Sequence, residues 1–511
     1  MKLFIIHIFS LIFPLSNNAY GTADPLINSL YRKKFTLDHQ NIPKVSIGIF
    51  HNIREVEIAT TGNIQIGTSM MEGISVNTSS VLQFKLKTGK KAEIDYYIAL
   101  TDIPYDSWKK FSSYYQKSII LEQGYLIALN GKMLDNRRIL PSIGPFKTYD
   151  KAKIRLKNIS KKYKKAFIHS KLKNLPEGNF SILPLNGSFS VSGADAVKLK
   201  SSKGNPFIIK SGNTSIKVAG EIYVVIDSSG MLAVVNELPL EKYLEGILPS
   251  ELWPGAPYEA LKAQAVAARG QVLSKMGTRH MTDPFHLCRK VHCQVYDGIN
   301  RLHKKTTAAC HATKGQILFT PSSRVVDTVY HSSCGGHTEH NENVWGGIPQ
   351  NTLRGTPDLI KGHISSNISN RLLKNEEGWC KKSNPGFRWT SKVSIKRISD
   401  NLKKRGFYGK IKSIRIINRG ISGRVLSLEA RSKKSSIIIK GELTIRKLLG
   451  NLKSSMFIHK FTDDKIIFNG GGYGHGVGMC QWGAINRAKA GQNYKKILLH
   501  YYKGSILKKL Y

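Results

Sequence analysis

The chain has 511 residues, of which 41% are hydrophobic and 22% charged, and 78 lysines and arginines against 34 aspartates and glutamates give a net charge of +44. This composition is that of a globular protein, and the length predicts two to four domains rather than a single core. The basic residues are spread along the chain, with no helix-turn-helix signal and no aromatic RNA-binding motif, so we expect no nucleic-acid partner. For an exported chain, this charge predicts an anionic envelope polymer or an anionic membrane face as the partner.

The N-terminus is typical of a secretory signal. Lys2 precedes an apolar run over residues 3–15, and a short polar stretch then leads to Ala19-Tyr20-Gly21. A charged start, a short apolar run and a small-residue end predict a signal peptide at 1–21, and thus export to the periplasm or cell envelope. A short membrane anchor is the alternative. No later stretch is long and apolar enough for a transmembrane segment in the mature chain.

The next two regions predict different kinds of structure. Residues 22–90 contain short alternating runs, beginning with PKVSIGIFHN at 43–52, and are expected to form an N-terminal β segment of the main body. Residues 91–175 alternate between strand-like and helical runs, which predicts a small α+β module. Its segment SIGPFKTYDKAKIRL (142–156) resembles the SPOR repeat, a module that binds glycan strands lacking stem peptides. A plain α+β insertion that spaces two halves of the chain is the alternative.

Residues 176–511 combine β-rich stretches with a few strong helices. Helices are expected at 239–248 and 257–276, the second with apolar residues at helical spacing, and at 482–490 and 494–502 near the C-terminus. The expected fold class is therefore α+β, a β-rich body with one long helix.

Five segments of this region carry a resemblance to a known family. They are, in chain order, NELPLEKYLEGILPSEL (236–252), EALKAQAVAARG (259–270), HCQVYDG (292–298), YHSSCGGHTEHNENVWGG (330–347) and GGYGHGVGMCQWGA (471–484). Together they resemble the stage II sporulation protein D / LytB (SpoIID) family of peptidoglycan lytic transglycosylases, over roughly 210–511. The resemblance implies that 176–511 is a catalytic domain whose long helix lines the cleft.

The same resemblance implies a catalytic acid. In that family the essential acid is the Glu of a Ser-Glu-aliphatic triplet, which is Ser250-Glu251-Leu252 in this chain. The apolar neighbours Leu252 and Trp253 are expected to raise the carboxyl pKa and keep a proton available. Glu241, Glu245 and Glu259 are the competing acids.

Other polar residues in the five segments are candidates for the substrate-binding cleft. The set consists of Gln264, Arg269, Gln294, Ser333, His475 and Gln481. Gln264 and Arg269 lie five positions apart and need not share a helix face; they are expected to orient the loop with Glu251 or to contact sugar. For His475, an ordinary loop histidine is the alternative. Trp345 and Tyr473 are candidate platforms for stacking on sugar rings.

A group of histidines and cysteines at 280–293 has the composition of a zinc site. It offers Cys288, Cys293, His292 and either His280 or His286, and we select His280, Cys288, His292 and Cys293 as the expected ligands of a structural zinc. A Cys288–Cys293 disulfide is the alternative, as is a pair of free thiols. Some members of the resembled family carry such a zinc. A further hypothesis pairs Cys334 with Cys480.

The resemblance implies cleavage of the MurNAc–GlcNAc bond in peptidoglycan glycan strands, giving 1,6-anhydroMurNAc ends. If the 91–175 module binds denuded glycan, a peptidoglycan amidase is the implied partner. A non-enzymatic peptidoglycan-binding scaffold of the envelope is the alternative, and a metal hydrolase is less consistent with the sequence because no His-Glu-x-x-His spacing is present.

Overall fold

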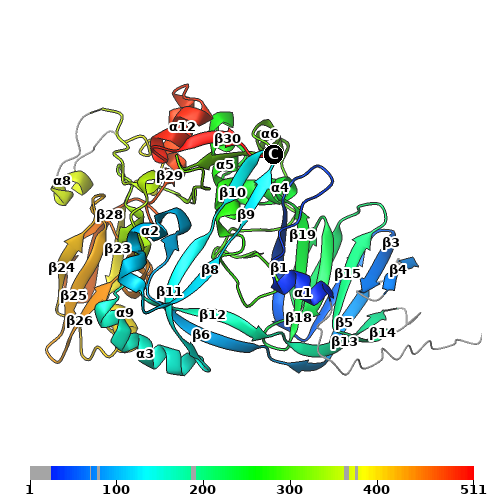
Figure 1. The fold of residues 1–511 in the computed structure, drawn as a ribbon. Helices are drawn as coiled ribbons and strands as arrows, with labels where there is room; N and C mark the ends of the chain where they lie inside the picture. Colours follow the sequence, from blue (N-terminus) through cyan, green and yellow to red (C-terminus); the bar gives the residue numbers. More distant parts are fainter. Residues whose placement is uncertain (1–24, 69–70, 78–80, 186–190, 362–366, 374–377) are drawn as a thin grey trace, which may run out of the picture.

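The computed structural model describes residues 25–68, 71–77, 81–185, 191–361, 367–373 and 378–511. Most strands of this part of the chain pair antiparallel, and most of the longer helices gather at one end of the sheets, so the expected α+β class is confirmed (Figure 1). The expected signal peptide, and the anchor that is its alternative, lie outside the described residues. Among the residues described, no helix combines the length and apolar character that a membrane crossing needs.

Two sheets form the body of the molecule. The first has the order β20-β1-β19-β18-β15-β3-β4 and the second the order β14-β13-β5-β2-β16-β17. The strands are β1 (Lys44–Ile53), β2 (Glu55–Thr60), β3 (Asn63–Thr68), β4 (Met71–Asn77), β5 (Leu82–Lys90), β13 (Glu177–Pro184), β14 (Val191–Ala194), β15 (Ala196–Ser201), β16 (Phe207–Ser211), β17 (Thr214–Val218), β18 (Glu221–Ile226), β19 (Leu232–Pro239) and β20 (Leu287–Cys288).

In these sheets, strands from the first 90 residues pair with strands that follow residue 176. β1 pairs antiparallel with β19, from Lys44 opposite Pro239 to Ile53 opposite Leu232, and β5 pairs with β13 in the same sense. β19 is buried along nearly its whole length, because one of its faces contacts the opposite sheet and the other contacts helices. The strands of the first 90 residues therefore belong to one body with strands that follow residue 176.

The intervening segment forms a smaller sheet. Its order is β12-β6-β11-β7, with β8 also paired to β11. The elements are β6 (Glu93–Ala99), β7 (Ile103–Pro104), α2 (Trp108–Phe111), β8 (Ile119–Gln123), β11 (Arg138–Phe146), α3 (Tyr149–Lys162) and β12 (Phe167–Asn174). Two helical stretches, α2 and α3, thus alternate with the strands of this sheet along the chain. Ile98, Leu100 and Ile159 form a small core of its own, and the likeness to SPOR stays a prediction.

One hairpin of this segment belongs to the main body instead. β9 (Leu126–Leu129) and β10 (Lys132–Asp135) bring Leu129 and Leu134 into the large core. The side chain of Asn136 then donates to the carbonyl oxygens of Leu273 (2.6 Å) and Met276 (2.9 Å), which end the long helix of the body. These hydrogen bonds attach the small sheet to the C-terminal end of the long helix.

A layer of helices covers one end of the body (Figure 1). It contains α4 (Leu240–Glu251), α5 (Tyr258–Lys275), α6 (Lys304–Ala312), α11 (Gln481–Lys489) and α12 (Tyr494–Tyr501). These bounds confirm the four helices predicted from the sequence. α5 contacts the other four helices, so almost every side of it is buried, polar residues included.

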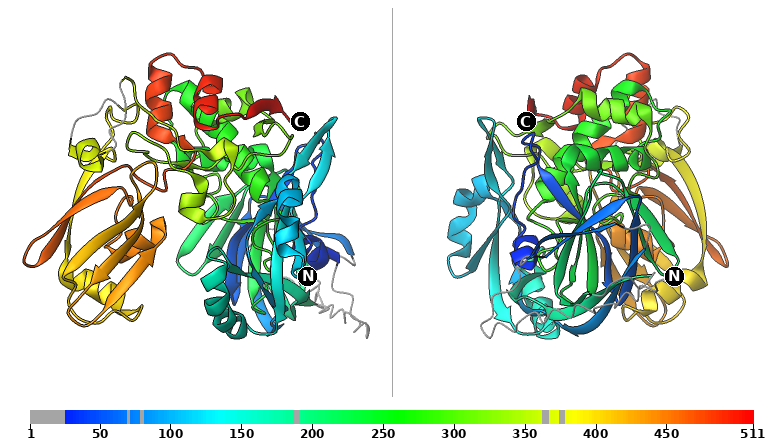
Figure 2. Two further views of the ribbon diagram at one scale, coloured as in Figure 1. Left: turned by 60° about the vertical axis from the view of Figure 1, so that its left-hand side comes forward. Right: turned by 90° about the vertical axis from the view of Figure 1, so that its right-hand side faces the viewer.

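Residues 388–471 form a separate lobe, drawn in yellow and orange beside the body in Figure 2. Its strands are β23 (Arg388–Ser394), β24 (Ser413–Arg419), β25 (Val425–Arg431), β26 (Ser436–Lys440), β27 (Phe457–Phe461) and β28 (Lys465–Gly471), with helices α9 (Ile395–Lys403) and α10 (Glu442–Leu448). A second hydrophobic core, including Trp389, Leu428 and Phe468, lies inside the lobe.

Short elements complete the structure. They are α1 (Pro25–Tyr31), β21 (Gln316–Phe319), β22 (Tyr330–His331), α7 (Asn341–Trp345), α8 (Ile368–Leu373), β29 (Met479–Cys480) and β30 (Ile506–Lys509). β22 and β29 pair in parallel, which joins the segment at 330–337 to the glycine-rich loop at 470–478.

Candidate active site

Glu251 is the last residue of α4, where the chain leaves the helix. Its side chain is partly buried, Leu252 is buried, and Trp253 is 54% exposed. The backbone N–H of Val295 donates to Glu251 Oε1 at 3.2 Å, and Gln481 Nε2 donates to the Glu251 carbonyl oxygen at 2.8 Å. Segments near 295 and 481 thus hold the predicted acid from two sides.

The surroundings of Glu251 favour its protonated form. Burial raises the pKa of this carboxyl above its usual value, although the Val295 N–H, the Tyr330 hydroxyl and the charge of Lys275 act to lower it. A carboxyl with a raised pKa keeps its proton closer to neutral pH, which is what a general acid requires.

Tyr330 is the site residue that sequence reasoning missed. Its hydroxyl hydrogen-bonds the carboxyl of Glu251 and accepts from Gln294 Nε2 at 3.3 Å. Its backbone carbonyl accepts from His475 Nε2 at 3.0 Å. Tyr330 was within reach of prediction, because it opens the motif YHSSCGG, but a tyrosine at a strand start is usually a packing residue.

His475 has a positioning role. Its Nδ1 accepts from the Val477 N–H at 3.0 Å, so Nε2 carries the proton donated to Tyr330. Burial, with the nearby charge of Arg424, lowers the pKa of His475 to about 3, and the ring stays neutral. The ring of Trp345, 54% exposed, lies against His475 with centroids 4.9 Å apart.

Three of the other predicted binding residues lie around the Glu251 segment, and a fourth is buried next to Asn384. Gln481 Nε2 also contacts Gln264 Oε1 at 3.4 Å, and Gln294 contacts Gln271 Oε1 at 2.9 Å, so these amides surround the Glu251 segment. Ser333 is fully buried and accepts from Asn384 Nδ2 at 2.9 Å.

Arg269 lies elsewhere. It is fully buried, and its Nε and Nη2 donate to the two oxygens of Glu241 at 2.9 and 2.8 Å. A third bond goes from Nη1 to the Gln316 carbonyl at 3.1 Å. Arg269 therefore ties α5 to α4 and offers no surface to a sugar, so the structure does not bring this predicted binding residue into the site.

The competing acids are each engaged in salt bridges. Glu241 pairs with Arg269, Glu245 with Lys242 (3.2 Å) and His311 (3.0 Å), and Glu259 with Lys262. Among these four described acids, Glu251 is the one without a salt bridge, so no ion pair holds it in its charged form.

The predicted zinc ligands come together. The ligand atoms of His280, Cys288, His292 and Cys293 all lie within 4.8 Å of one another, with His280 Nε2 3.3 Å from Cys293 Sγ. His280 Nδ1 contacts Asp283 Oδ2 at 2.8 Å, the carboxylate support common behind metal-bound histidines.

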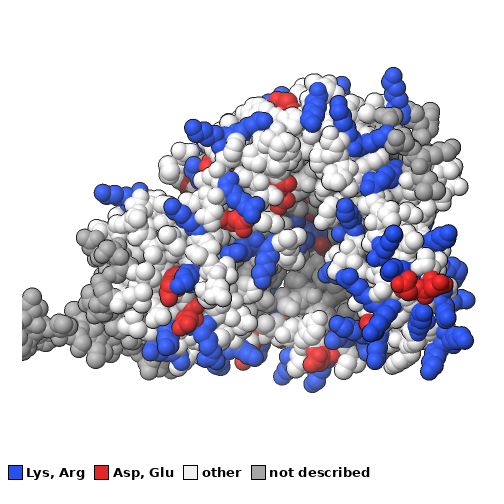
Figure 3. Space-filling view, turned by 180° about the vertical axis from the view of Figure 1, so that it is seen from behind, with Lys and Arg blue, Asp and Glu red and all other residues white. Residues whose placement is uncertain are grey.

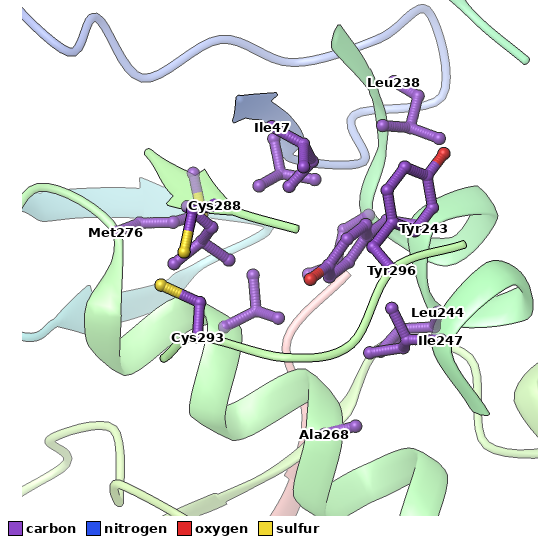
Figure 4. Close-up of a cluster of buried hydrophobic side chains, with 14 of the residues drawn as sticks. Ile47, Leu238, Tyr243, Leu244, Ile247, Ala268, Met276, Cys288, Cys293 and Tyr296 are labelled. Carbon is purple, nitrogen blue, oxygen red and sulfur yellow. The ribbon is translucent and has the colours of Figure 1, made fainter. Parts of the chain in front are cut away.

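The alternative ligand His286 faces away from this group, toward Ser46 Oγ at 2.7 Å. Figure 4 shows the sulfur atoms of Cys288 and Cys293 turned toward each other beside the core residues Met276 and Tyr296. The donor set fits a tetrahedral zinc ion, and the structure holds both cysteines as free thiols.

The glycine-rich loop encloses a buried arginine from the 388–471 lobe. Arg424 donates to the Cys334 carbonyl at 3.3 Å, and a Cβ at Gly476 would lie 2.4 Å from Arg424 Cζ. Gly476 also has φ +85°, so both the backbone conformation and the close approach of Arg424 require glycine at this position.

Seen from behind, the molecule has a hollow between the body and the 388–471 lobe, with Lys and Arg side chains near it (Figure 3).

The chain is similar in sequence to known proteins. Residues 228–319 match the family model described as "Stage II sporulation protein", and residues 339–478 match a domain of unknown function. An uncharacterized protein of Brachyspira hyodysenteriae is 33% identical over 279 residues, which is 53% of this chain and 67% of that protein. The chain belongs to the stage II sporulation protein D (SpoIID) family.

Two named relatives are also similar. The amidase enhancer of Bacillus subtilis is 29% identical over 359 residues, covering 61% of this chain and 49% of the relative, so the chain spans about half of that protein. Stage II sporulation protein D of Bacillus amyloliquefaciens is 28% identical over 293 residues, covering 53% of this chain and 74% of the relative.

Proposed function

We propose that this protein is an exported peptidoglycan lytic transglycosylase that cleaves MurNAc–GlcNAc bonds and leaves 1,6-anhydroMurNAc ends. The observation that carries the proposal is the state of Glu251. Its carboxyl has a raised pKa and no salt bridge and is held by Val295 and Tyr330, while Gln481 holds its backbone carbonyl and the exposed Trp253 lies two residues on. Membership of the SpoIID family supports it.

One carboxyl is enough for this chemistry. Protonated Glu251 donates its proton to the bridging oxygen, the C1–O bond of MurNAc breaks, and the GlcNAc-side fragment leaves with the proton as a new hydroxyl. The Glu251 carboxylate then takes the proton of the sugar's own C6 hydroxyl, whose oxygen forms the new bond to C1. The proton returns to Glu251 and no water is consumed, so the second carboxylate of most glycosidases is not needed.

A zinc ion bound by the 280–293 cluster would have a structural role. His280, Cys288, His292 and Cys293 would hold it, and it would fix the segment that leads, two residues after Cys293, to the Val295 N–H on Glu251. The substrate class we propose is denuded glycan, with the 91–175 module as a glycan-binding unit. The resemblance to an amidase enhancer supports an amidase as the source of such strands.

The test replaces Glu251 by Gln and measures anhydro-muropeptides released from amidase-treated and untreated sacculi by mass spectrometry. We expect Glu251→Gln to lower release by about 100-fold or more, because the proton donor is lost. The matched control is Glu245→Gln, on the same helix, where the amide can still accept from Lys242.

Undiminished anhydro product from Glu251→Gln would reject the assigned acid. Wild-type protein that binds sacculi but releases no anhydro ends would support the scaffold function instead. Equal release from treated and untreated sacculi would reject the preference for denuded glycan.

A further inference from the structure

A second cluster of metal-ligating side chains includes Cys480, the residue before Gln481. Cys334, Cys380, Cys480 and Asp358 are all fully buried, and their ligand atoms lie within 4.8 Å of one another. Cys334 Sγ is 3.4 Å from Cys380 Sγ and 3.2 Å from Asp358 Oδ2. Four residues from distant parts of the sequence thus meet around one point.

Backbone N–H groups point at two of the sulfur atoms. Cys480 Sγ accepts from the N–H groups of Cys334 (3.2 Å) and Gly483 (3.3 Å), and Cys334 Sγ accepts from Gly336 at 3.4 Å. The Gly483 donor belongs to the first turn of α11, whose positive end faces the sulfur. Such donors stabilise thiolates, the form of cysteine that binds metal.

Asp358 is held with one oxygen toward this cluster. Its Oδ1 accepts from Arg487 Nη2 at 2.8 Å, and Tyr501 reaches both oxygens at 3.1 and 3.0 Å. Its Oδ2 faces Cys334. A carboxylate and three cysteines gathered out of water are costly to bury as anions, and the two basic side chains at Asp358, Arg487 and His500 (3.5 Å from Oδ1), offset only part of that charge.

We propose that Cys334, Cys380, Cys480 and Asp358 bind a second zinc-class divalent ion. A tetrahedral zinc with Zn–S bonds of about 2.3 Å separates its ligand atoms by about 3.8 Å. Here Cys334 Sγ lies 3.4 Å from Cys380 Sγ and 3.2 Å from Asp358 Oδ2, and no two of the four ligand atoms are more than 4.8 Å apart. A disulfide would use two sulfurs and leave the third as a buried thiol, whereas one ion uses all three sulfurs and Asp358 Oδ2.

The ion would hold together the segments that contact Glu251 and the glycine-rich loop. Cys480 directly precedes Gln481, which holds the Glu251 carbonyl, and Cys334 directly follows Ser333, which pairs with Tyr473 of the glycine-rich loop. The Cys380 carbonyl accepts from Asn384, the residue that also binds Ser333 Oγ. The site does not depend on the proposed function, since a scaffold could contain it equally well.

The first experiment measures zinc in the purified full chain by elemental analysis, with Cys380→Ser, Cys288→Ser and Cys310→Ala alongside. Cys310 is buried and belongs to neither cluster, so it is the matched control. We expect Cys380→Ser to lower the zinc content by about one ion per chain, Cys288→Ser to leave this second ion in place, and Cys310→Ala to equal the wild type. A zinc content unchanged by Cys380→Ser would overturn the proposal.

A second experiment uses the wild type alone, so that misfolding of a variant cannot obscure the answer. The folded protein is alkylated with and without prior removal of metal by a chelator, and the labelled cysteines are located by mass spectrometry. Cys334, Cys380 and Cys480 should react together only after chelation. A disulfide between any two of them in protein purified without reductant would overturn the proposal.

Discussion

Tyr330 is expected to act on Glu251 through a single hydroxyl group. Its hydroxyl stabilises the ionised form of Glu251, so Tyr330→Phe should raise the Glu251 pKa further and lower kcat/KM by about tenfold, the value of one hydrogen bond to a charged group. A general acid works protonated, so activity falls as pH rises through its pKa. The alkaline limb of the kcat/KM profile should therefore move to higher pH in Tyr330→Phe.

The control for this measurement is Tyr494→Phe, which removes a hydroxyl that contacts Gln316 Oε1 at 2.9 Å. This hydroxyl does not contact Glu251, so the limb should stay at the wild-type pH. An alkaline limb in Tyr330→Phe at the wild-type position would show that the hydroxyl does not act on Glu251, whatever the loss of rate.

A sequence motif was enough to select Glu251 as a candidate acid. It was not enough to tell toward which neighbour a helical side chain points. The triplet predicted Glu251 as the acid, which stays a prediction, and the structure shows it partly buried beside the buried Leu252. Gln264 and Arg269 could not be separated, because five residues on a helix place them on different sides and α5 is surrounded on all sides. Only the fold reveals that Gln264 meets Gln481 and Arg269 meets Glu241.

The glycine-rich loop at 470–478 can hardly accept larger residues at Gly476, because the side chain of Arg424 lies directly against it. A Cβ at Gly476 would strain a backbone with φ +85° and meet Arg424 Cζ at 2.4 Å, so Gly476→Ala should reduce the free energy of unfolding by about 2–4 kcal/mol. Gly491 has φ +81°, but a Cβ added there would meet no atom within 4 Å, so Gly491→Ala should cost only about 1 kcal/mol.

Denaturant unfolding of both variants checks this comparison. Equal losses would mean that the backbone angle alone accounts for the effect, and that Arg424 moves aside without cost. A larger loss for Gly476→Ala would establish that the loop and the 388–471 lobe are coupled through this arginine.

Helices of this chain were easier to predict than the organisation of its strands. The pattern of apolar residues located α4, α5, α11 and α12 because a helix is determined by residues three and four apart. The pairing of β1 with β19 spans almost two hundred residues, and the separate core of the 388–471 lobe depends on strands meeting across the lobe. Local patterns contain no such information.

At the scale of the whole molecule, the net charge of +44 should determine how the protein holds its polymer. Lys and Arg side chains, with a few Asp and Glu, lie near the hollow in Figure 3, and each MurNAc of a denuded strand carries a lactyl carboxylate. The Debye length shrinks from about 10 Å at 0.1 M salt to about 3 Å at 1 M. Affinity for sacculi should therefore fall several-fold over this range, as measured by pull-down.

The matched comparison uses sacculi whose carboxylates have been converted to neutral amides. Binding to these should be weak at low salt and nearly independent of salt, because the anionic partner is gone while the sugar rings remain for Trp345 and Tyr473. Equal affinity for native and amidated sacculi would show that sugar stacking, rather than charge, holds the glycan, and the basic surface would then have no part in recognition.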